Sequence, residues 1–177
     1  MSLPGFRGVD HCGFTVPDME QAVRFFVDVL GCEEFYSLGP FRDDDGDSMQ
    51  RFFNLHPRTV VEEIRLLRCG NLNFELFQCS APERLTQPPT MADVGGQHLA
   101  FYVDDIDAAV AHLERHDVRV LGEKLPAPGP EAGLGAYFVY FLSPWGMTLE
   151  LISYPNGRAY EREHSGRLWN PARPDLA

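Results

Sequence analysis

Four side chains of types that bind divalent metals occupy matching places in the two halves of the sequence: His11 and Glu75, then His98 and Glu150. Each glutamate lies among Leu, Phe or Ile residues. An ionised carboxylate in such surroundings costs several kcal/mol unless a partner compensates its charge. Two imidazoles and two carboxylates suit Zn, Ni, Co, Mn or Fe(II), and leave one or two positions open on a six-coordinate ion. The residues therefore predict a single divalent metal ion held by these four side chains.

The segments around these four residues repeat. The run HCGFTV that begins at His11 matches HLAFYV at His98, since each reads His, apolar, small, Phe, hydroxyl-bearing, Val. The run NFELF around Glu75 matches TLELI around Glu150. Two independent matches in the same order indicate an internal duplication. Each half is therefore predicted to supply one histidine and one glutamate.

Each half is predicted to run as a strand, a helix and three further strands. After the His11 strand, apolar residues keep helical spacing over 19–30, with Asp18 placed to cap this helix and Gly31 to end it. After the His98 strand, a second apolar stripe over 106–113 begins behind Asp104 or Asp105. The remaining strands are predicted at 32–37, 59–68 and 72–78, and at 117–121, 136–142 and 147–153.

The predicted domain organisation is a first module over residues 7–79, a linker over 80–95, a second module over 96–155 and a C-terminal arm over 156–177. Residues 38–58 and 121–135 are rich in Gly, Pro and Asp and are predicted to be loops. A chain of 177 residues is long enough to bury a substantial core. The arm carries few apolar residues, so it is not expected to belong to that core.

Composition excludes several classes of partner. The net charge of -11 and the sequence pI of about 4.9 argue against binding to nucleic acid and to anionic membrane surfaces. No apolar run approaches the roughly 18 residues of a membrane span, and the first residues do not look like a secretory signal. A cytoplasmic location and a small-molecule substrate are therefore expected.

The cysteines and one acidic run gave weaker expectations. Cys12, Cys32, Cys69 and Cys79 match no C-x-x-C motif, and a reducing compartment would keep them as thiols. The acidic run over 43–47 lacks the glutamate that closes an EF-hand, so it is expected to be a solvated loop.

Three motifs, GVDHCGFTVPDMEQAVRFFVDVLG, QHLAFYVDDIDAAVAHL and SPWGMTLELISYP, make residues 7–155 resemble the vicinal oxygen chelate superfamily. This superfamily includes glyoxalase I, methylmalonyl-CoA epimerase, extradiol dioxygenases and the bleomycin and fosfomycin resistance proteins. The resemblance implies an α+β fold of two tandem βαβββ modules, whose curved mixed sheets form a metal-binding cup. It also implies a substrate bound through two adjacent oxygens, and a homodimer.

The identities of the four predicted ligands distinguish between the reactions that members of that superfamily catalyse. Extradiol dioxygenases use two His and one Glu, so Glu75 counts against them, and methylmalonyl-CoA epimerases typically have Gln at that position. Bacterial glyoxalase I has His, Glu, His, Glu as here, but the long segment 38–58 and the arm are not typical of its compact forms. The ending SYPNGRAYE resembles members that epimerise polyhydroxylated cyclic ketones. The chain is therefore predicted to be a metal-dependent isomerase or lyase.

In such a reaction Glu75 or Glu150 would remove and return a proton next to a carbonyl, and the sequence does not say which. Tyr102, Tyr137 and Tyr140 are candidates to line the cup or to pack as ordinary aromatic residues. The rival class is a metal-free, drug-sequestering protein of the bleomycin-resistance type, because the acidic charge would suit a cationic drug. An extradiol-type dioxygenase is the second alternative. All four ligands together favour the enzyme.

Overall fold

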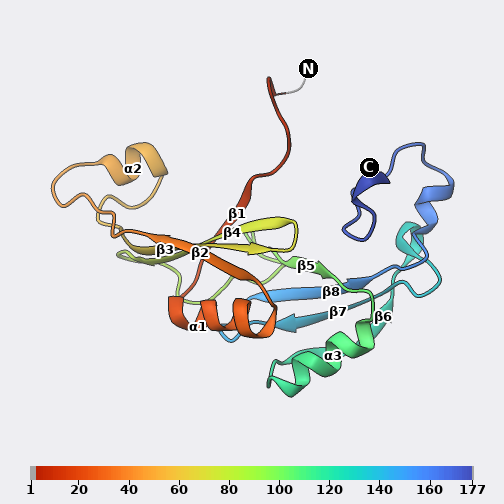
Figure 1. Ribbon diagram of the computed structural model, residues 1–177. Coiled ribbons are helices and arrows are strands. Elements are labelled where there is room, and N and C mark those ends of the chain that lie inside the picture. Colours follow the sequence, from red (N-terminus) through yellow and green to blue (C-terminus); the bar gives the residue numbers. More distant parts are fainter. Residues whose placement is uncertain (1–2, 177) are drawn as a thin grey trace. The chain divides into compact units, whose positions relative to one another are not determined.

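Each half of the chain folds as its own β-sheet unit in the computed structural model, which describes residues 3–176 (Figure 1). The boundary between the two compact units falls between Thr86 and Gln87. The first unit contains β1 (His11–Thr15), α1 (Met19–Arg24), a π-helical turn (Phe25–Val29), β2 (Glu33–Leu38), α2 (Ser48–Phe53), β3 (Val60–Cys69) and β4 (Leu72–Ser80). The second contains β5 (Leu99–Tyr102), α3 (Ile106–Arg115), β6 (Val120–Pro126), β7 (Tyr137–Leu142) and β8 (Thr148–Ser153), with short 3-10 turns at Gly129–Glu131, Ala159–Arg162 and Pro174–Leu176.

The two sheets share one topology. The strand order is β1-β4-β3-β2 in the first unit and β5-β8-β7-β6 in the second. In each, the opening strand runs parallel to the closing strand, and the other neighbours are antiparallel. The predicted α+β fold of two βαβββ modules is confirmed.

Both predicted helix starts are confirmed. The Asp18 carboxylate accepts a hydrogen bond from the Gln21 backbone N–H at 2.8 Å, and Asp105 accepts one from Ala108 at 2.9 Å. Such caps satisfy backbone donors that have no partner within the helix. The first helix continues as a π-helical turn before Gly31, whose φ of +75° ends it.

One face of each sheet carries the core. In the first unit the rings of Phe14, Phe26 and Phe74 lie 5.5–5.7 Å apart, which joins β1 and β4 to the helical segment after Met19. In the second unit Leu149 and Leu151 of β8 are buried, as are Ile106 and Leu113 of α3. Because side chains alternate along a strand, the neighbouring positions, including Glu75 and Glu150, point to the opposite face.

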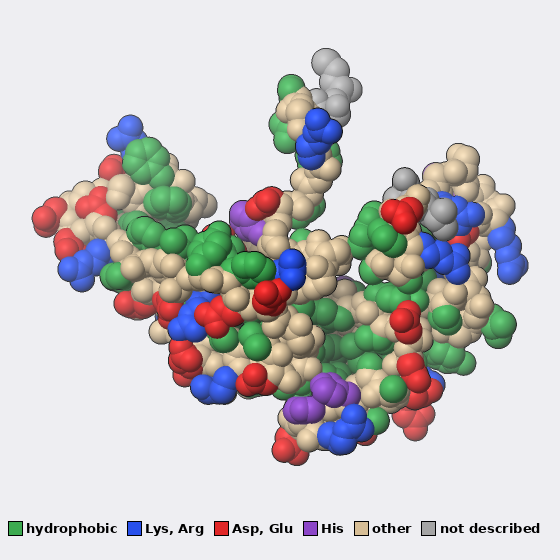
Figure 2. Space-filling view, viewed as in Figure 1, with side chains coloured by type: hydrophobic (Ala, Val, Ile, Leu, Met, Phe, Trp, Pro, Cys, Tyr) green, Lys and Arg blue, Asp and Glu red, His purple; other side chains and the backbone are tan. Residues whose placement is uncertain are grey.

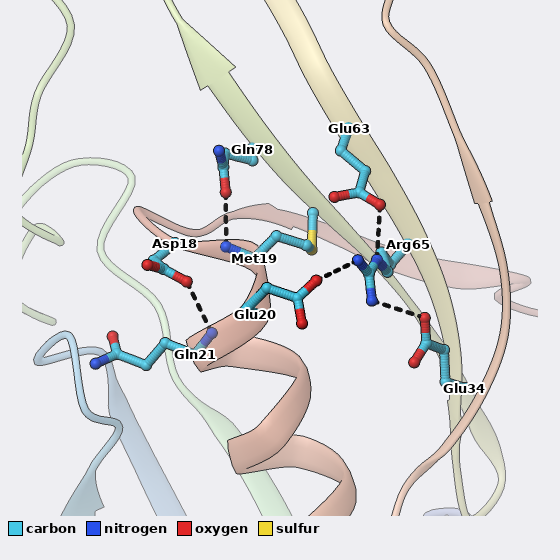
Figure 3. Close-up of polar contacts among 8 residues, drawn as sticks. All are labelled: Asp18, Met19, Glu20, Gln21, Glu34, Glu63, Arg65 and Gln78. Atoms are coloured by element: carbon cyan, nitrogen blue, oxygen red, sulfur yellow. Dashed lines mark hydrogen bonds and ion pairs between the residues drawn. The ribbon is translucent and has the colours of Figure 1, made fainter.

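Polar contacts fix α1 on the first sheet (Figure 3). The Gln78 side-chain oxygen on β4 accepts a hydrogen bond from the Met19 backbone N–H at 2.6 Å. The Arg65 guanidinium on β3 contacts the carboxylates of Glu20, Glu34 and Glu63, so it ties α1 and β2 to β3. With the helix held in this way, the opposite face of the sheet is left to other segments.

A short helix, α2, covers part of that opposite face in the first unit. Met49 of α2 is buried against Val61 and Ile64, with Leu66 and Phe77 packed around them. The prediction that residues 38–58 are all loop is therefore wrong over Ser48–Phe53, because one buried methionine is too weak a periodic signal for a helix. Figure 2 shows hydrophobic side chains gathered over α2 and the neighbouring strands.

The acidic run before α2 is closed by its own hydrogen bonds. The Asp43 carboxylate accepts from the backbone N–H groups of Gly46 and Ser48 at 2.7 and 3.0 Å and from the Ser48 hydroxyl at 2.7 Å. These bonds favour the ionised form and lower the pKa of Asp43 to about 2. Arg58 donates to the carbonyl oxygens of Asp43, Asp44 and Gly46, so the loop is also held from the β3 side.

Two further expectations need correction. Cys32 and Cys69 form a disulfide with their Cα atoms 4.4 Å apart, so the expectation of four thiols holds only for Cys12 and Cys79. Their separation of 37 residues gave no sign of this, because only the antiparallel pairing of β2 with β3, in which Glu33 lies opposite Arg68, brings the two cysteines together. In the second unit β6 extends to Pro126, past the predicted end at 121, through an irregular register with β7. Within residues 3–176, no helix is long and apolar enough to cross a membrane.

Candidate metal and substrate site

The first predicted pair lies on the face of the first sheet opposite α1. Glu75 of β4 is in register with Gly13 of β1, and His11 lies two residues earlier on the same face. The distance from His11 Nε2 to Glu75 Oε2 is 3.3 Å. A Cβ at Gly13 would lie 3.7 Å from Glu75 Oε2 and 3.2 Å from the Phe77 ring, so the small residue gives the carboxylate room.

The second pair repeats this arrangement. Glu150 of β8 is in register with Ala100 of β5, again a small residue, and His98 comes immediately before β5. The distance from His98 Nε2 to Glu150 Oε2 is 3.0 Å. The His98 ring meets the edge of the Tyr140 ring with centroids 5.5 Å apart. The duplication seen in the sequence thus places one His–Glu pair on each sheet.

Asp10 fixes the imidazole of the first pair. Its carboxylate lies 2.7 Å from His11 Nδ1, and this hydrogen bond is the main reason that the pKa of His11 is raised. The Asp10 backbone oxygen accepts in turn from the Asn73 side chain at 3.0 Å. A carboxylate accepts only, so Nδ1 of His11 carries the proton in this contact, and Nε2 of the neutral ring is the nitrogen that could bind a metal ion.

Burial is the main influence on the pKa of the carboxyl group in the second pair. The Glu150 side chain is 9% exposed, against 22% for Glu75. Burial raises the pKa of Glu150, and the neighbouring charge of Glu131 adds to this, while His98 and Arg158 act in the opposite direction. A carboxyl group with a raised pKa can hold a proton more readily than an exposed one.

The donor geometry of each pair fits two ligands of one metal ion. Ligand atoms about 2.1 Å from a zinc-like ion lie about 3.0–3.4 Å apart at octahedral or tetrahedral angles. The pairs measure 3.3 and 3.0 Å between nitrogen and oxygen. In the first pair the Asp10–His11 contact is an arrangement that often accompanies metal-binding histidine, whereas without a metal the protonated ring donates from Nε2 to Glu75.

The structure brings the four predicted ligands together two by two. Across residues 3–176 no group of three or more His, Cys, Asp or Glu side chains gathers around a position suited to a metal ion. Each unit alone therefore provides a two-ligand arrangement, and the four-residue centre stays a prediction.

Aromatic side chains surround the second pair on its sheet. Tyr140 is in register with Glu150, and Phe138 with Ile152, so both share the Glu150 face. Tyr102 lies on that face too, with its ring 4.8 Å from the ring of Tyr154. Tyr137 does not, since it is in register with Ser153 and lies under Lys124, which is paired with Asp107 of α3. The alternation of β7 therefore assigns Tyr137 to the helix side.

One cation on the second unit was not predicted from the sequence. Arg158, in the first turn of the arm, lies 3.8 Å above the Tyr154 ring and 3.5 Å from Glu131, and its side chain is only 12% exposed. The ending SYPNGRAYE, which contains Arg158, is the sequence signal for it. Asp10 was missed as well, because an exposed residue next to a candidate ligand has no distinctive pattern.

With the fold and the two pairs in view, the relationship to known proteins becomes clear. Residues 10–141 match the family model described as the glyoxalase/bleomycin resistance protein/dioxygenase superfamily. The chain therefore belongs to this superfamily, as the sequence motifs had indicated.

Two curated relatives extend over most of the chain. One, a 2-epi-5-epi-valiolone epimerase from Actinomyces sp, is 43% identical over 172 residues, which cover 96% of this chain and 91% of the relative. The other, the uncharacterised protein YaeR of Escherichia coli K12, is 31% identical over 148 residues, covering 83% of this chain and 96% of the relative.

Solved structures agree on the fold. A glyoxalase family protein from Bacillus cereus superposes with a TM-score of 0.62 at 19% identity, covering 86% of this chain and 98% of its own. A variant of the fosfomycin resistance protein FosX from Listeria monocytogenes, complexed with Mn(II) and 1S,2S-dihydroxypropylphosphonic acid, has a TM-score of 0.57 at 16% identity. It covers 90% of this chain and 99% of its own. At these identities the comparison speaks for the fold alone.

Proposed function

We propose that this protein is a divalent-metal-dependent epimerase of a small polyhydroxylated cyclic ketone. The observation that carries the proposal is the 43% identity, over nearly the whole chain, to an enzyme named for the epimerisation of 2-epi-5-epi-valiolone. The two His–Glu pairs support it, since they supply the donor atoms and the carboxylates that such a reaction requires.

We further propose that His11, Glu75, His98 and Glu150 hold one divalent ion. The fit of each pair to adjacent ligand positions supports this, as does the Asp10 carboxylate, which holds a proton on His11 Nδ1. When bound, such an ion acts as a Lewis acid that makes a proton next to a carbonyl easier to remove. Its identity among Zn, Ni, Co, Mn and Fe is left to measurement.

The protein's own residues would then move the proton. Epimerisation inverts one carbon, so the proton must leave from one side of the molecule and return to the other. One carboxylate can accept it as a base and a second, protonated carboxyl group can donate it. Glu75 and Glu150 are the carboxylates that we propose for these two roles. Tyr140 and Phe138 would pack against the ring carbons.

The test combines metal analysis with isotope exchange. We expect the purified protein to carry close to one divalent ion per chain, and to incorporate solvent deuterium into 2-epi-5-epi-valiolone at the carbon that is epimerised. The His11→Ala variant should lose both properties. The matched control is His164→Ala, which removes an exposed histidine bonded only to its local backbone at Gly166.

The outcomes separate the rival classes. A protein that takes up no metal on soaking and causes no exchange would instead match the metal-free, drug-binding class. Metal uptake with exchange only into a methylglyoxal–glutathione hemithioacetal would indicate a glyoxalase I type of lyase. Oxygen consumption with a catechol would indicate the dioxygenase alternative.

We also propose that the chain acts as a homodimer. Large apolar side chains remain exposed on β2 and α2, among them Phe35, Tyr36, Phe52 and Phe53. Apolar patches of this kind are typical of protein interfaces. Sedimentation should give twice the chain mass of 20.0 kDa, and a monomer at micromolar concentration would contradict the proposal.

A further inference from the structure

The beginning of the C-terminal arm is seated firmly on the second unit. The Ala159 backbone N–H donates to the Ala132 carbonyl at 2.7 Å, and the Asn156 side chain donates to the Leu134 carbonyl at 2.8 Å. A Cβ on Gly133 would lie 2.3 Å from the Gly157 carbonyl, so the two backbones touch where neither has a side chain. The arm is therefore a built part of this unit at Arg158.

Arg158 lies toward the face that carries Glu150. Glu150, Ile152 and Tyr154 follow one another at every second residue and so share one face of β8 and its extension. Tyr154 is buried with Tyr102 and Ile152 around it, and the Arg158 guanidinium rests 3.8 Å above its ring. Its charge is close enough to act on Glu150.

Most of the N–H donors of Arg158 take no part in its ion pair with Glu131. A guanidinium has five N–H donors in a planar fork, and the ion pair with Glu131 engages Nη1 only, at 3.5 Å, with a carboxylate that is 51% exposed. The Tyr154 ring holds the plane of the fork from below. A largely buried cation that is stacked but weakly paired is suited to a molecule with several neighbouring oxygen atoms.

We infer that Arg158 binds and orients the substrate, donating hydrogen bonds to hydroxyl oxygens of the small molecule that is epimerised in the proposed reaction. The inference rests on the proposed function and deepens it, because it assigns the arm to recognition of a polyhydroxylated ligand. Arg158 is a binding residue in this scheme and takes no proton.

The experiment measures kcat and KM separately with 2-epi-5-epi-valiolone. For Arg158→Met we expect KM to rise about 10- to 100-fold, the usual worth of hydrogen bonds from a charged donor, with kcat within about threefold. Arg158→Lys keeps the charge and loses the fork, so its KM should rise nearly as much. The control is Arg162→Met, an exposed arginine in the same turn, which should leave KM unchanged.

A purely structural role is tested with Glu131→Gln. If Arg158 only anchored the arm through its ion pair, this variant would raise KM as much as Arg158→Met does, and that result would overturn the inference. If Arg158 binds substrate, Glu131→Gln should change KM by less than about threefold. An unchanged KM in Arg158→Met, with an active wild type, would overturn it too.

Failure of the proposed function has a different signature. A wild-type protein that neither epimerises the compound nor exchanges deuterium into it would refute that function. The inference would then be decided by the NMR signal of the Arg158 Nε–H group during titration with millimolar 2-epi-5-epi-valiolone. A saturable shift absent from Arg162 would support binding, and no shift would refute it.

Discussion

The two His–Glu pairs occupy equivalent strand positions, but the residues around them differ. In the first unit Asp10 holds the imidazole of His11, while Glu75 remains 22% exposed. In the second unit Glu150 is buried to 9% exposure and His98 packs against Tyr140, and the residue in the place of Asp10 is Gln97. The two strand pairs have equivalent registers but different neighbours, namely an acceptor on the imidazole in one half and a buried carboxyl group with a raised pKa in the other.

The segments that cover the two site faces differ as well. The first sheet receives α2 through the buried Met49, and the Cys32–Cys69 disulfide closes the chain around that insertion. The second sheet receives the arm, held by backbone hydrogen bonds near Gly133 and by Arg158 on Tyr154. The same βαβββ unit thus tolerates unrelated covers, because the sheet face needs apolar contact but no specific element.

The largest expected effect concerns the two carboxylates. Glu75→Gln and Glu150→Gln should each lower kcat for epimerisation by about 10²- to 10⁴-fold, because each removes a group that carries a proton. Steady-state kinetics with metal-loaded protein checks this, with Glu163→Gln of the exposed arm as the control. A variant that retains more than a third of the wild-type kcat would assign the proton transfer to the other half alone.

Removing the Cys32–Cys69 disulfide should destabilise the first unit and leave the second unit unchanged. Cys32→Ser together with Cys69→Ser should cost about 2–4 kcal/mol of unfolding free energy, since the bond closes a loop of 37 residues in the unfolded chain. Urea denaturation followed by hydrogen exchange would measure it, and the loss of protection should be confined to the first unit. Cys12→Ser, at a free thiol, is the control. Equal loss in the second unit would show that the halves unfold together.

Asp10 should matter only to the metal affinity of the first pair. Asp10→Asn should weaken divalent-metal binding about 10- to 100-fold, with the lower value expected because Asp10 is 87% exposed. Competition with a chromophoric chelator gives the affinity, and Gln97→Ala tests the equivalent place in the second half. If the two variants behave alike, the two halves do not differ in how their imidazoles are held.

The smallest effect is the acid response of the Asp43 loop. Its folded pKa of about 2 lies below the ordinary 3.8, so the stabilisation is present above pH 3.8 and is lost as the pH falls through 2. The Gly46 and Ser48 amide signals should follow that titration in NMR spectra, and Asp43→Asn should abolish it. The loop at 127–136, closed by a backbone hydrogen bond from the Ala127 N–H to the Ala136 carbonyl, should not respond. A midpoint near 4 would contradict the three hydrogen bonds to Asp43.

Periodic and repeated features carried most of the successful predictions. The caps at Asp18 and Asp105, the strands of both sheets and the pairing of each histidine with its glutamate follow from alternation and duplication, which are local in sequence. The helix at Ser48–Phe53 and the Cys32–Cys69 bond were not predictable, because each depends on one contact made by residues distant in the chain.

The sequence by itself determined which residues could do chemistry, because the repeat of His and Glu marks them and strand alternation turns them away from the helices. Tertiary structure alone decided what surrounds them. Glu150 is buried to 9% exposure, Tyr137 falls on the helix side, and Arg158 rests on Tyr154. Ligand types can be read from a one-dimensional pattern, whereas burial and neighbouring charge depend on which segments the fold packs against them.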